Sequence, residues 1–451
     1  MKIDLQELFK DIYHEKTFSL PHDYNRFVID SREVVKGDIF IALKGNTTDG
    51  HNFVSDALER GAIFAVVEND LKVDGRVVKV NSTFEFLKYL GNFARKKVNS
   101  AIFGITGSAG KTTTKEGLYL ALSKRFNVIK TEGNINTDVS LPLFFANEIT
   151  NLEDFVVVEM GVQKPNDMNI LLDIVRPHYG IITNVGDSHL EYLKDRKGVL
   201  NEKFKLVRFV LDLGGVCFIN GDDELLYSAS NGLKGVFKVG FNKENDFRLT
   251  ILEESFDSMK LKINVQDRIF EFTVPYNGFA YNVGLIFASS VYVGVDPDYV
   301  VSALREFKPY KGRGEKIKLG SMTIIDDTYN SNPISMNLAL ERLKGVKGPV
   351  VLILGDMLEL GEYSKTLHEK VGESISKVNP YALITYGNFS KFINEKGSAT
   401  IKYHFEDSNL LSQFLKTYNF KEGTYFLVKG SRGMKMEQFV QVLKERYGDE
   451  S

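Results

Sequence analysis

Residue types suited to binding phosphate stand together in the segment GITGSAGKTTTKEG, Gly104 to Gly117. An apolar run, SAIFGIT, leads into it and an amphipathic pattern follows, which predicts a strand, a loop and a helix in that order. Backbone N–H groups at the start of such a helix point toward an anion, and Gly107 and Gly110 let the backbone approach it closely. Lys111 has the reach to contact the β- and γ-phosphates, and the Thr112 hydroxyl is a ligand for Mg²⁺. We therefore predict an ATP or GTP site.

The loop departs from the strict phosphate-loop pattern at one position, because Ile105 stands where that pattern has glycine. The alternative interpretation is a glycine-rich turn with an incidental lysine, but the order of strand, loop and helix favours a nucleotide site. The loop by itself leaves open hydrolysis, transfer of phosphate to a hydroxyl, and activation of a carboxylate. The residues predicted to contact the nucleotide here are Thr106, Gly107, Ser108, Ala109, Gly110, Lys111, Thr112 and Thr113.

Three polar residues downstream of the loop are candidates for metal chemistry. Glu159 ends the apolar run DFVVVEM, and an acid at the end of a strand beside a phosphate loop is typical of a Mg²⁺ ligand. His189 lies in a polar turn after another apolar run, and Lys203 lies on a predicted helix. Each also has an ordinary interpretation: a strand-end acid that meets solvent, a structural histidine and a solvated surface lysine. These residues indicate a Mg²⁺–nucleotide enzyme and leave the reaction undecided.

Composition narrows the class of protein. A chain of 451 residues has room for roughly three domains, and 43% hydrophobic and 26% charged residues are typical of globular proteins. The net charge of −2 gives no sign of the excess of basic residues that is typical of proteins that bind nucleic acid or an anionic membrane. The single cysteine, Cys217, excludes an internal disulfide and a cysteine-based zinc site. There is no apolar run of membrane-spanning length and no secretory signal pattern. We expect a cytoplasmic protein that acts as a monomer.

Three blocks must position these residues. Residues 1–98 carry short strand-like runs, such as GDIFIAL and AIFAVVE, and end in a predicted helix. Residues 99–311 alternate continuous apolar runs with helical patterns, which predicts a parallel sheet, and an alternating stretch near the end predicts an antiparallel appendage. A linker, KPYKGRGEK, leads into residues 312–451, where runs such as PVVLILGDM and YFLVKGSRG predict a second α/β domain.

Motifs along nearly the whole chain resemble those of the Mur ligases of peptidoglycan synthesis. The first block contains DSREVVKGDIFIALKGNTTDG, which resembles the family's uridine-diphosphate-binding segment. The middle block contains TGSAGKTTTKE, TEGNINTDVSLP, VVEMG and TNVGDSHLE in the family's order. The last block contains IIDDTYNSNPISM, LILGDMLELGEYS and LVKGSRGMKME, which are similar to the branch that adds D-alanyl-D-alanine to a UDP-N-acetylmuramoyl tripeptide.

The resemblance implies a fold and a reaction. The expected fold is α/β with three domains: a small UDP-substrate-binding domain (1–98), a central ATP-binding domain with a phosphate-loop parallel sheet (99–311) and a Rossmann-like acceptor-binding domain (312–451). In the expected reaction, ATP phosphorylates a peptide carboxylate, and the amine of D-alanyl-D-alanine attacks the resulting acyl phosphate. Carried over by position, Thr112, Glu159 and His189 hold two Mg²⁺ ions, and Lys203 is carbamylated by CO₂ and becomes a metal ligand.

Further residue roles follow only from the resemblance. Lys111, His189 and Lys203 are the expected catalytic residues, and Asn282 and Arg313 are expected to reach the nucleotide. A nucleotide-side motif matches Asn220 and either Asp222 or Asp223. The expected substrate-binding residues are Ser31, Arg32, Asn46, Thr47, Asp49, Asn134, Asn136, Asp326, Tyr329, Asn330 and Asn332.

Two positions depart from the family's pattern. Gly284 stands where a second nucleotide-side asparagine is expected, and Lys205 stands where related chains tend to carry an acid.

Two other functions remain as alternatives. A sister ligase that adds a single amino acid would share most of these motifs. A nucleotide-binding switch without ligase activity would share the phosphate loop, although NKEN at 242–245 has the wrong fourth residue for a guanine motif. Phosphate release that depends on the acceptor separates a ligase from a switch.

Overall fold

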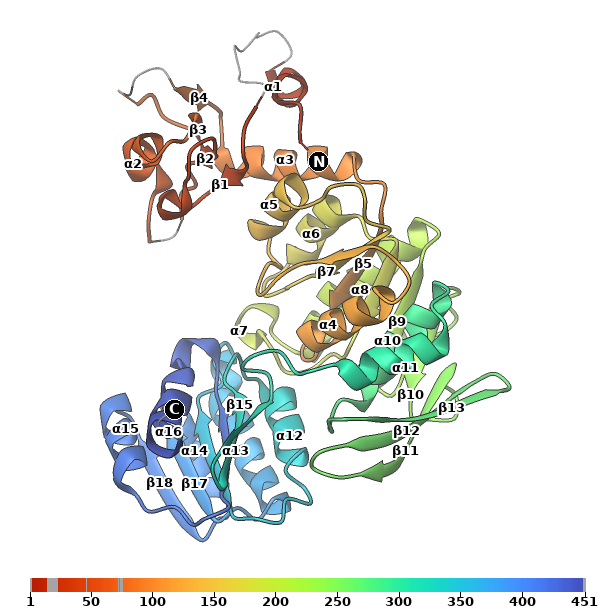
Figure 1. The fold of residues 1–451 in the computed structure, drawn as a ribbon, viewed down its shortest axis with the longest axis vertical. Helices are drawn as coiled ribbons and strands as arrows, with labels where there is room; N and C mark the ends of the chain where they lie inside the picture. Colours follow the sequence, from red (N-terminus) through yellow and green to blue (C-terminus); the bar gives the residue numbers. More distant parts are fainter. Residues whose placement is uncertain (1, 14–22, 46, 72, 74–75, 449–451) are drawn as a thin grey trace. The chain divides into compact units, whose positions relative to one another are not determined.

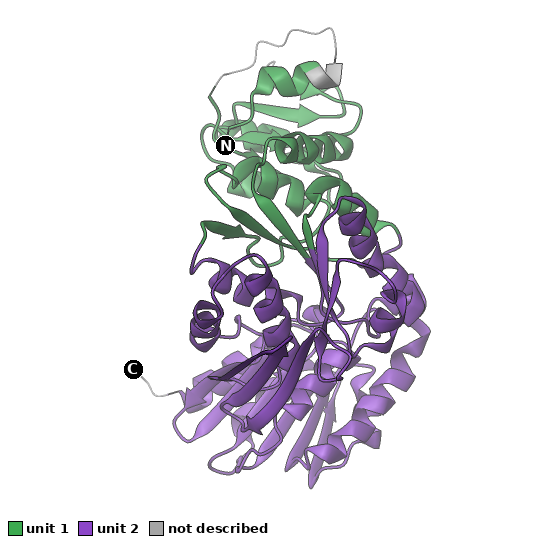
Figure 2. Ribbon diagram, turned by 90° about the vertical axis from the view of Figure 1, so that its right-hand side faces the viewer, with its two compact units in different colours: residues 1–104, 126–162, 166–179 green, residues 105–125, 163–165, 180–451 purple. Residues whose placement is uncertain are grey.

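The computed structural model describes residues 2–13, 23–45, 47–71, 73 and 76–448 of the chain (Figure 1). Backbone contacts divide the chain into two compact units (Figure 2). The first unit contains residues 1–104, 126–162 and 166–179, and the second contains residues 105–125, 163–165 and 180–451. Each unit is described below by itself.

The first unit begins with a small sheet of four parallel strands in the order β1-β2-β3-β4. Its strands are β1 (Phe27–Val28), β2 (Ile39–Ile41), β3 (Phe64–Val67) and β4 (Val77–Lys79). The run GDIFIAL forms β2, whose residues are all buried, as a strand covered on both faces requires. Phe40 and Ala65 pack with Ala57 and Leu58 of helix α2 (Val54–Glu59) in one apolar cluster. The predicted α/β character of the first block is confirmed.

Helix α3 (Thr83–Lys96) joins this small sheet to the rest of the first unit. The Ser82 side chain caps the helix by accepting a hydrogen bond from the Glu85 N–H, and the apolar face of α3 packs on α5 (Ser140–Asn147) and α6 (Asp167–Val175). The contact with α5 is close, since a Cβ atom at Gly91 would lie 2.8 Å from Cα of Pro142. The first block therefore shares its packing with residues 126–179.

The central sheet has nine strands in the order β13-β12-β11-β10-β9-β8-β5-β7-β6. Its strands are β5 (Ala101–Thr106), β6 (Val128–Lys130), β7 (Phe155–Glu159), β8 (Tyr179–Ile182), β9 (Val216–Asn220), β10 (Val236–Gly240), β11 (Phe247–Glu254), β12 (Met259–Val265) and β13 (Arg268–Val274). The pairs β6–β7, β9–β10 and β10–β11 are parallel, whereas β11–β12 and β12–β13 are antiparallel. The predicted antiparallel appendage is thus confirmed.

Helices of the second unit carry the phosphate loop and its neighbours. They are α4 (Lys111–Leu122), α7 (Leu190–Leu193), α8 (Arg196–Asp212), α9 (Glu224–Ala229), α10 (Ala280–Tyr292) and α11 (Pro297–Glu306). α4 packs against α10 and α11, and Gly117 of α4 makes this possible because a Cβ there would lie 2.4 Å from Cδ1 of Ile286. The predicted linker follows α11, and its Gly312 and Gly314 both have positive φ angles, +72° and +80°.

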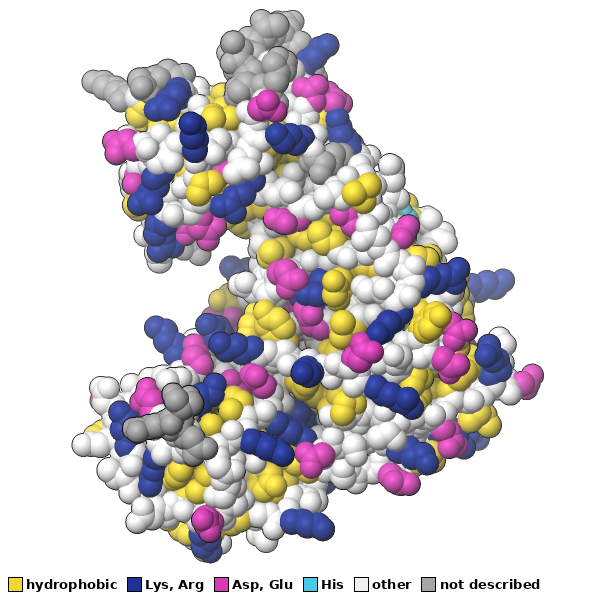
Figure 3. All heavy atoms as spheres, viewed as in Figure 1, with side chains coloured by type: hydrophobic (Ala, Val, Ile, Leu, Met, Phe, Trp, Pro, Cys, Tyr) yellow, Lys and Arg dark blue, Asp and Glu magenta, His cyan; other side chains and the backbone are white. Residues whose placement is uncertain are grey.

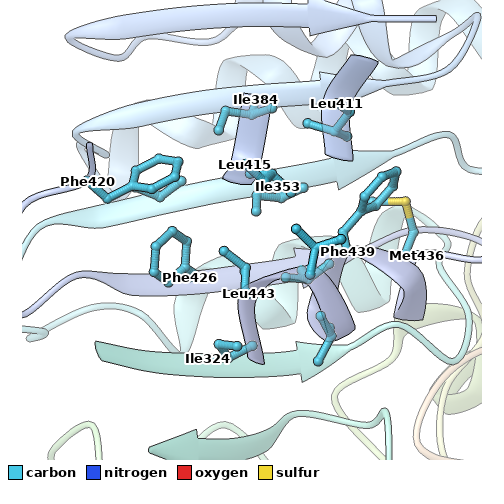
Figure 4. Close-up of a cluster of buried hydrophobic side chains, with 14 of the residues drawn as sticks. Ile324, Ile353, Ile384, Leu411, Leu415, Phe420, Phe426, Met436, Phe439 and Leu443 are labelled. Atoms are coloured by element: carbon cyan, nitrogen blue, oxygen red, sulfur yellow. The ribbon is translucent and has the colours of Figure 1, made fainter. Parts of the chain in front are cut away.

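The C-terminal sheet has six strands in the order β14-β15-β19-β16-β17-β18. Its elements are β14 (Glu315–Leu319), β15 (Met322–Asp327), α12 (Pro333–Glu341), β16 (Val350–Gly355), α13 (Ser364–Ser374), β17 (Ala382–Tyr386), α14 (Ser390–Lys396), β18 (Ile401–Phe405), α15 (Ser408–Thr417), β19 (Tyr425–Lys429) and α16 (Glu437–Tyr447). Only β14 runs antiparallel to its neighbour. One face of the sheet is covered by α15 and α16, where Phe426, Phe439 and Leu443 form part of the apolar core in Figure 4. The predicted second α/β domain is confirmed.

The surface carries both signs of charge side by side. On the face drawn in Figure 3, lysine and arginine side chains are intermixed with aspartate and glutamate, in line with the net charge of −2. Among the described residues, no helix combines the length and the apolar character that crossing a membrane requires.

Candidate active site

The phosphate loop connects β5 to α4 as the sequence predicts. Gly107 and Gly110 have φ angles of +148° and +83°, which side-chain-bearing residues rarely adopt. A Cβ atom at position 107 would also lie 1.9 Å from Oγ1 of Thr183, so glycine is required there by both conformation and space. Lys111 donates from Nζ to the carbonyl oxygen of Gly107 at 2.8 Å, and Thr112 is buried in the first helical turn. Ile105, the departure from the strict pattern, is a fully buried strand residue.

Two residues that sequence analysis gave no role brace this loop. Thr183 donates from Oγ1 to the carbonyl oxygen of Ala109 at 2.5 Å, and Asn184 donates from Nδ2 to the same oxygen at 3.0 Å. Asn184 also accepts a hydrogen bond at Oδ1 from the Ala109 N–H. Both residues belong to the motif TNVGDSHLE, which was singled out for its histidine. The motif therefore shapes the loop as well as carrying His189.

Asn282 braces the loop from the other side. Its Nδ2 donates to the carbonyl oxygen of Gly110 at 3.0 Å and to Oγ1 of Thr114 at 2.9 Å. Its predicted contact with the nucleotide stays a prediction. Two positions on, a Cβ at Gly284 would lie 2.7 Å from Cγ1 of Val239 and 2.9 Å from the methyl groups of Leu249. Position 284 thus faces strands β10 and β11, and close packing explains why glycine stands where an asparagine was expected.

In the first unit, Glu159 ends β7 with a side chain that is 2% exposed. Its Oε1 accepts a hydrogen bond from Nδ2 of Asn136 at 2.9 Å, and its N–H donates to Oγ1 of Thr131. The Gly161 N–H in turn donates to the carbonyl oxygen of Asn136. A buried carboxylate is costly without a cation or donors, so this environment fits a Mg²⁺ ligand. Asn134, in the same segment, is exposed.

In the second unit, His189 precedes α7 with a φ angle of +55°, and its Nδ1 lies 2.6 Å from Oε2 of Glu359. Burial lowers the pKa of His189, and the positive charges of Lys203 and Lys111 also lower it. The hydrogen bond with Glu359 and the negative charge of that residue act to raise it. Burial and the two lysines therefore favour the neutral form of the imidazole. The hydrogen bond from His189 lowers the pKa of Glu359, which is ionised.

Lys203 is a buried residue of α8, with 1% exposure. The interpretation as a solvated surface lysine is wrong for this reason. The neighbouring Glu202 is also buried and forms an ion pair with Lys205, whose Nζ lies 2.7 Å from Oε2 of Glu202. This pair shows how a lysine is accommodated at 205, where an acid was expected. Carbamylation of Lys203 stays a prediction.

The predicted metal ligands are divided between the two units, with Glu159 in the first and Thr112, His189 and Lys203 in the second. Among the described residues, no three His, Cys, Asp or Glu side chains are grouped closely enough to hold an ion. The predicted set contains only two of these types, Glu159 and His189, together with the Thr112 hydroxyl and Lys203. The Thr112 hydroxyl and the buried Glu159 carboxylate are oxygen ligands of the kind that Mg²⁺ prefers, and a carbamate on Lys203 would add more of them, whereas an imidazole is a less usual ligand for this ion.

Loops at the carboxyl ends of β15, β16 and β19 form the C-terminal part of the site. Asn332 caps α12 and donates from Nδ2 to the carbonyl oxygen of Ser108 at 2.9 Å, so the DDTYNSNP motif touches the phosphate loop. The Arg313 guanidinium lies 4.0 Å from the centre of the Tyr329 ring, which brings two predicted residues together. Asp326 accepts hydrogen bonds from Thr328.

Lys429 and Ser431 are functional candidates that sequence analysis quoted in a motif but did not select. Lys429 is 1% exposed; its Nζ lies 2.8 Å from Oδ2 of Asp327 and donates to the carbonyl oxygen of Asn330. Burial lowers the pKa of Lys429, and Asp327 opposes this. Ser431 donates to the carbonyl oxygen of Ser331 and accepts from the Leu358 N–H. Lys429 carries no apolar periodicity signal, so sequence spacing could not identify it.

The predicted UDP-binding residues surround short turns of the first unit. Ser31 is buried in the turn η1 (Ser31–Glu33), and Arg32 is exposed beside Asp30, whose pKa it holds at about 2 through a hydrogen bond. Asp49 caps the turn η2 (Gly50–Phe53) and accepts from His51. Thr47 is exposed. Asn46 lies outside the described residues.

Two acids of the nucleotide-side motif have structural partners. Asp222 accepts hydrogen bonds from the Phe241 N–H, from Nδ2 of Asn245 and from the Tyr281 hydroxyl. Asp223 caps α9 and accepts from the Val185 N–H. A contact of this motif with the nucleotide stays a prediction.

Comparisons with known proteins agree with this fold. Three family models match successive parts of the chain: "Mur ligase family, catalytic domain" at residues 24–99, "Mur ligase middle domain" at 105–289 and "Mur ligase, glutamate ligase domain" at 312–432. The chain belongs to the Mur ligase family.

Among its relatives, the UDP-N-acetylmuramoyl-tripeptide--D-alanyl-D-alanine ligase of Bacillus subtilis is 31% identical over 426 residues, which cover 92% of each chain. The solved structure of MurF from Acinetobacter baumannii is similar at a TM-score of 0.89, with 27% identity and 98% of each chain covered. MurF of Thermotoga maritima in complex with ADP is similar at a TM-score of 0.84, with 28% identity, and the match covers 94% of this chain and 98% of that one.

Proposed function

We propose that the chain is an ATP-dependent, ADP-forming ligase that joins D-alanyl-D-alanine to UDP-N-acetylmuramoyl-tripeptide. One observation carries this proposal: full-length similarity to relatives of that name comes together with a C-terminal loop whose Asn332 contacts the phosphate loop at Ser108. The DDTYNSNP loop is the segment expected to face the acceptor. Contact between the two loops supports a site in which an amine and a phosphorylated carboxylate would meet.

The reaction proceeds by two displacements. A carboxylate oxygen of the tripeptide attacks the γ-phosphorus of ATP, and ADP leaves with the electron pair of the broken P–O bond. The amine of the dipeptide then attacks the acyl carbon, and the tetrahedral intermediate expels inorganic phosphate and loses a proton. Mg²⁺, when bound, neutralises charge on the phosphoryl oxygens. Lys111 adds a side-chain cation at the same oxygens.

The chain's own residues prepare these steps. Backbone N–H groups at the start of α4 would bind the phosphates, and the braces from Thr183, Asn184 and Asn282 hold the loop before substrate arrives. Thr112, Glu159, His189 and a carbamylated Lys203 would hold Mg²⁺. Arg313 stacked on Tyr329 would reach the nucleotide from the linker. Ser31, Arg32 and Asp49 would bind the UDP group. We further propose that the protein acts in the cytoplasm, where ATP is available, and as a monomer.

A product assay tests the function. The protein is mixed with ATP, Mg²⁺ and UDP-N-acetylmuramoyl-tripeptide, and separate reactions receive D-alanyl-D-alanine, D-alanine or D-glutamate. Mass spectrometry is expected to find a pentapeptide product with the dipeptide, and much slower coupling of single amino acids. Faster coupling of a single amino acid would identify a sister ligase. ATP hydrolysis at the full rate without any peptide substrate would identify a switch.

A further inference from the structure

A contact between two distant segments joins the predicted metal histidine to the C-terminal domain. His189 and Glu359 are 170 positions apart, and Nδ1 of the histidine lies 2.6 Å from Oε2 of the glutamate. The histidine side chain is 16% exposed and the glutamate side chain 40% exposed. Neither the composition nor the family motifs assign a role to Glu359, the fourth residue of the run DMLELG after β16.

The backbones on both sides of this contact are fixed in an uncommon conformation. His189 has a φ angle of +55° and Glu359 one of +63°, and left-handed backbone is unfavourable for a residue with a side chain. The Glu191 N–H donates to the carbonyl oxygen of Glu359 at 3.2 Å, and a Cβ at Gly361 would lie 3.2 Å from Cα of Glu191. The two segments therefore hold each other in place by backbone contact as well as through the side chains.

The loop that presents Glu359 is itself anchored in the C-terminal domain. The Met357 N–H donates to Nε2 of His368, and the Leu358 N–H donates to Oγ of Ser431. Asp356 accepts three backbone N–H groups at the start of α14. The position of the Glu359 carboxylate is thus set by β16, α13 and the loop after β19. His189, in contrast, belongs to the segment that braces the phosphate loop.

The hydrogen bond determines which nitrogen of the imidazole is available. A carboxylate oxygen accepts hydrogen bonds, so its contact with Nδ1 at 2.6 Å puts the proton of a singly protonated ring on Nδ1. The lone pair is then on Nε2. A carboxylate that accepts from one ring nitrogen while the other binds a metal is a recurring arrangement that fixes ring orientation and tautomer.

We propose that Glu359 is a positioning residue that holds His189 as the Nδ1–H tautomer, so that the docked C-terminal loop completes the phosphoryl-transfer site. One consequence of this inference rests on the proposed function. It is that activation of the peptide carboxylate is efficient when the domain that carries the acceptor loop is in place. Acyl phosphate would then form mainly where an amine can reach it, which limits its loss to water.

The tautomer is measured directly in the full-length chain. The protein contains seven histidines, and ¹⁵N labelling of histidine with NMR detection distinguishes Nδ1–H from Nε2–H rings. A His189→Gln variant assigns the signal. The wild type is expected to show Nδ1–H at His189, Glu359→Gln to keep it because an amide oxygen still accepts, and Glu359→Ala to shift it toward Nε2–H.

Glu362→Ala is the matched control, because Glu362 is an exposed glutamate of the same loop. An Nε2–H ring in the wild type, an unchanged ring in Glu359→Ala, or an equal shift in Glu362→Ala would each overturn the proposal. Circular dichroism melting curves show whether the variants are folded. If Glu359→Ala is unfolded, the tautomer of the wild-type ring still decides the test.

A second measurement addresses the metal without relying on turnover. Mn²⁺ binding, followed by electron paramagnetic resonance in the presence of a non-hydrolysable ATP analogue, is expected to weaken about 10- to 100-fold in Glu359→Ala. Glu362→Ala should bind Mn²⁺ as the wild type does. Equal Mn²⁺ affinity in Glu359→Ala and wild type would contradict the proposal. Failure of the wild type to couple the dipeptide would instead contradict the proposed function, and would leave the tautomer result standing.

Discussion

Lys203 is the residue whose structure differs most from what its sequence suggests. A lysine on a helix is usually solvated, but this side chain is 1% exposed and close enough to His189 for its charge to act there. Burying an ammonium group costs several kcal/mol unless partners compensate for lost hydration. A carbamate at this position would exchange a buried cation for an anionic metal ligand. Burial therefore distinguishes Lys203 from a solvated surface lysine, and its carbamylation stays our proposal.

Lys203→Ala is expected to lower ligation by about 100-fold or more, because it would remove a metal-binding group beside the phosphoryl-transfer site. Acetate or formate added to this variant should restore part of the rate by occupying the space of the lost carbamate. Steady-state kinetics with and without the anion make the measurement. Lys197→Ala, an exposed lysine of the same helix, is the control and should behave as the wild type. A fully active Lys203→Ala protein would rule out the modification.

Lys111→Ala should reduce turnover by about 10²- to 10³-fold, since a preorganised charge is lost from the phosphoryl group in the transition state. The fold should remain intact, because the Gly107 carbonyl that Lys111 contacts lies on the loop itself. Turnover and thermal unfolding are measured side by side. Lys124→Ala, at an exposed site beyond the end of α4, serves as the control. Turnover within tenfold of the wild type would contradict the phosphate-loop assignment.

Sequence reasoning found the local parts of the site and missed those made by distant partners. The phosphate loop and the strand-end position of Glu159 follow from adjacent residues, since a strand, loop and helix in series are visible as pattern. The partnership of His189 with Glu359, and that of Lys429 with Asp327, depends on segments joined only by folding. The amide of Asn282 braces the loop, a contact that spacing cannot reveal, and its predicted contact with the nucleotide stays a prediction.

At the scale of elements, α3 is the connection that organises the first unit. Arg95, near its end, is 8% exposed and donates three hydrogen bonds to backbone carbonyl oxygens, those of Val175, Val98 and Arg176. Two of these carbonyls lie at the C-terminal end of α6, where helix carbonyls lack partners within the helix. A cation there also interacts favourably with the helix dipole. Arg95 thus ties the end of α3 to the end of α6.

Arg95→Ala is therefore expected to destabilise the protein by about 2–4 kcal/mol, because it leaves three carbonyl oxygens without their charged donor. Chemical denaturation followed by circular dichroism gives the change in unfolding free energy. Lys96→Ala, next along the chain and exposed, should change it by less than about 0.5 kcal/mol. Equal stability of the two variants would show that water satisfies these carbonyls as well as Arg95 does.

Helices and strands could be predicted where their apolar residues recur at a clear period. Continuous apolar runs gave the parallel strands, and strict alternation gave the antiparallel strands β11, β12 and β13. Gly284 shows the limit, because the need for a residue without a side chain arises from strands β10 and β11, far from it in sequence. Strand order was equally out of reach, since it is decided by how helices cover each face.

At the scale of the whole molecule, the first sequence block does not pack as a separate body. Asn147 of α5 accepts from the Phe27 N–H and donates to the Phe27 carbonyl, both at 2.9 Å, and Gly91 of α3 lies against Pro142. Residues 1–104, 126–162 and 166–179 accordingly fall in one compact unit. A boundary near residue 98 marks a change of motif, and the division of the chain into 1–98, 99–311 and 312–451 stays our proposal.

Deleting residues 1–98 should therefore abolish binding of the UDP-substrate and also lower the melting temperature of what remains, because α5 and α6 lose the apolar cover of α3. Arg32→Ala keeps that cover, and we expect it to weaken UDP-substrate binding about 10- to 100-fold while the melting temperature stays unchanged. Calorimetry supplies both quantities. If the truncated chain melted as the intact chain does, α3 would be dispensable for the first unit. If Arg32→Ala bound the UDP-substrate normally, the predicted site would be elsewhere.

The order of strands in the C-terminal sheet has a consequence for how this protein is made. β19 is the last of the described strands to be synthesised, yet it lies between β15 and β16, with Tyr425 opposite both Thr323 and Val350. While the chain is still on the ribosome, β15 and β16 have emerged but have no strand to join them, and each presents an open edge that invites pairing with other chains. A message that stops translation before Tyr425 would yield a product that keeps those edges open. In the cell, such a product would be a substrate for chaperones and proteases, even though nearly all of its apolar strands are present.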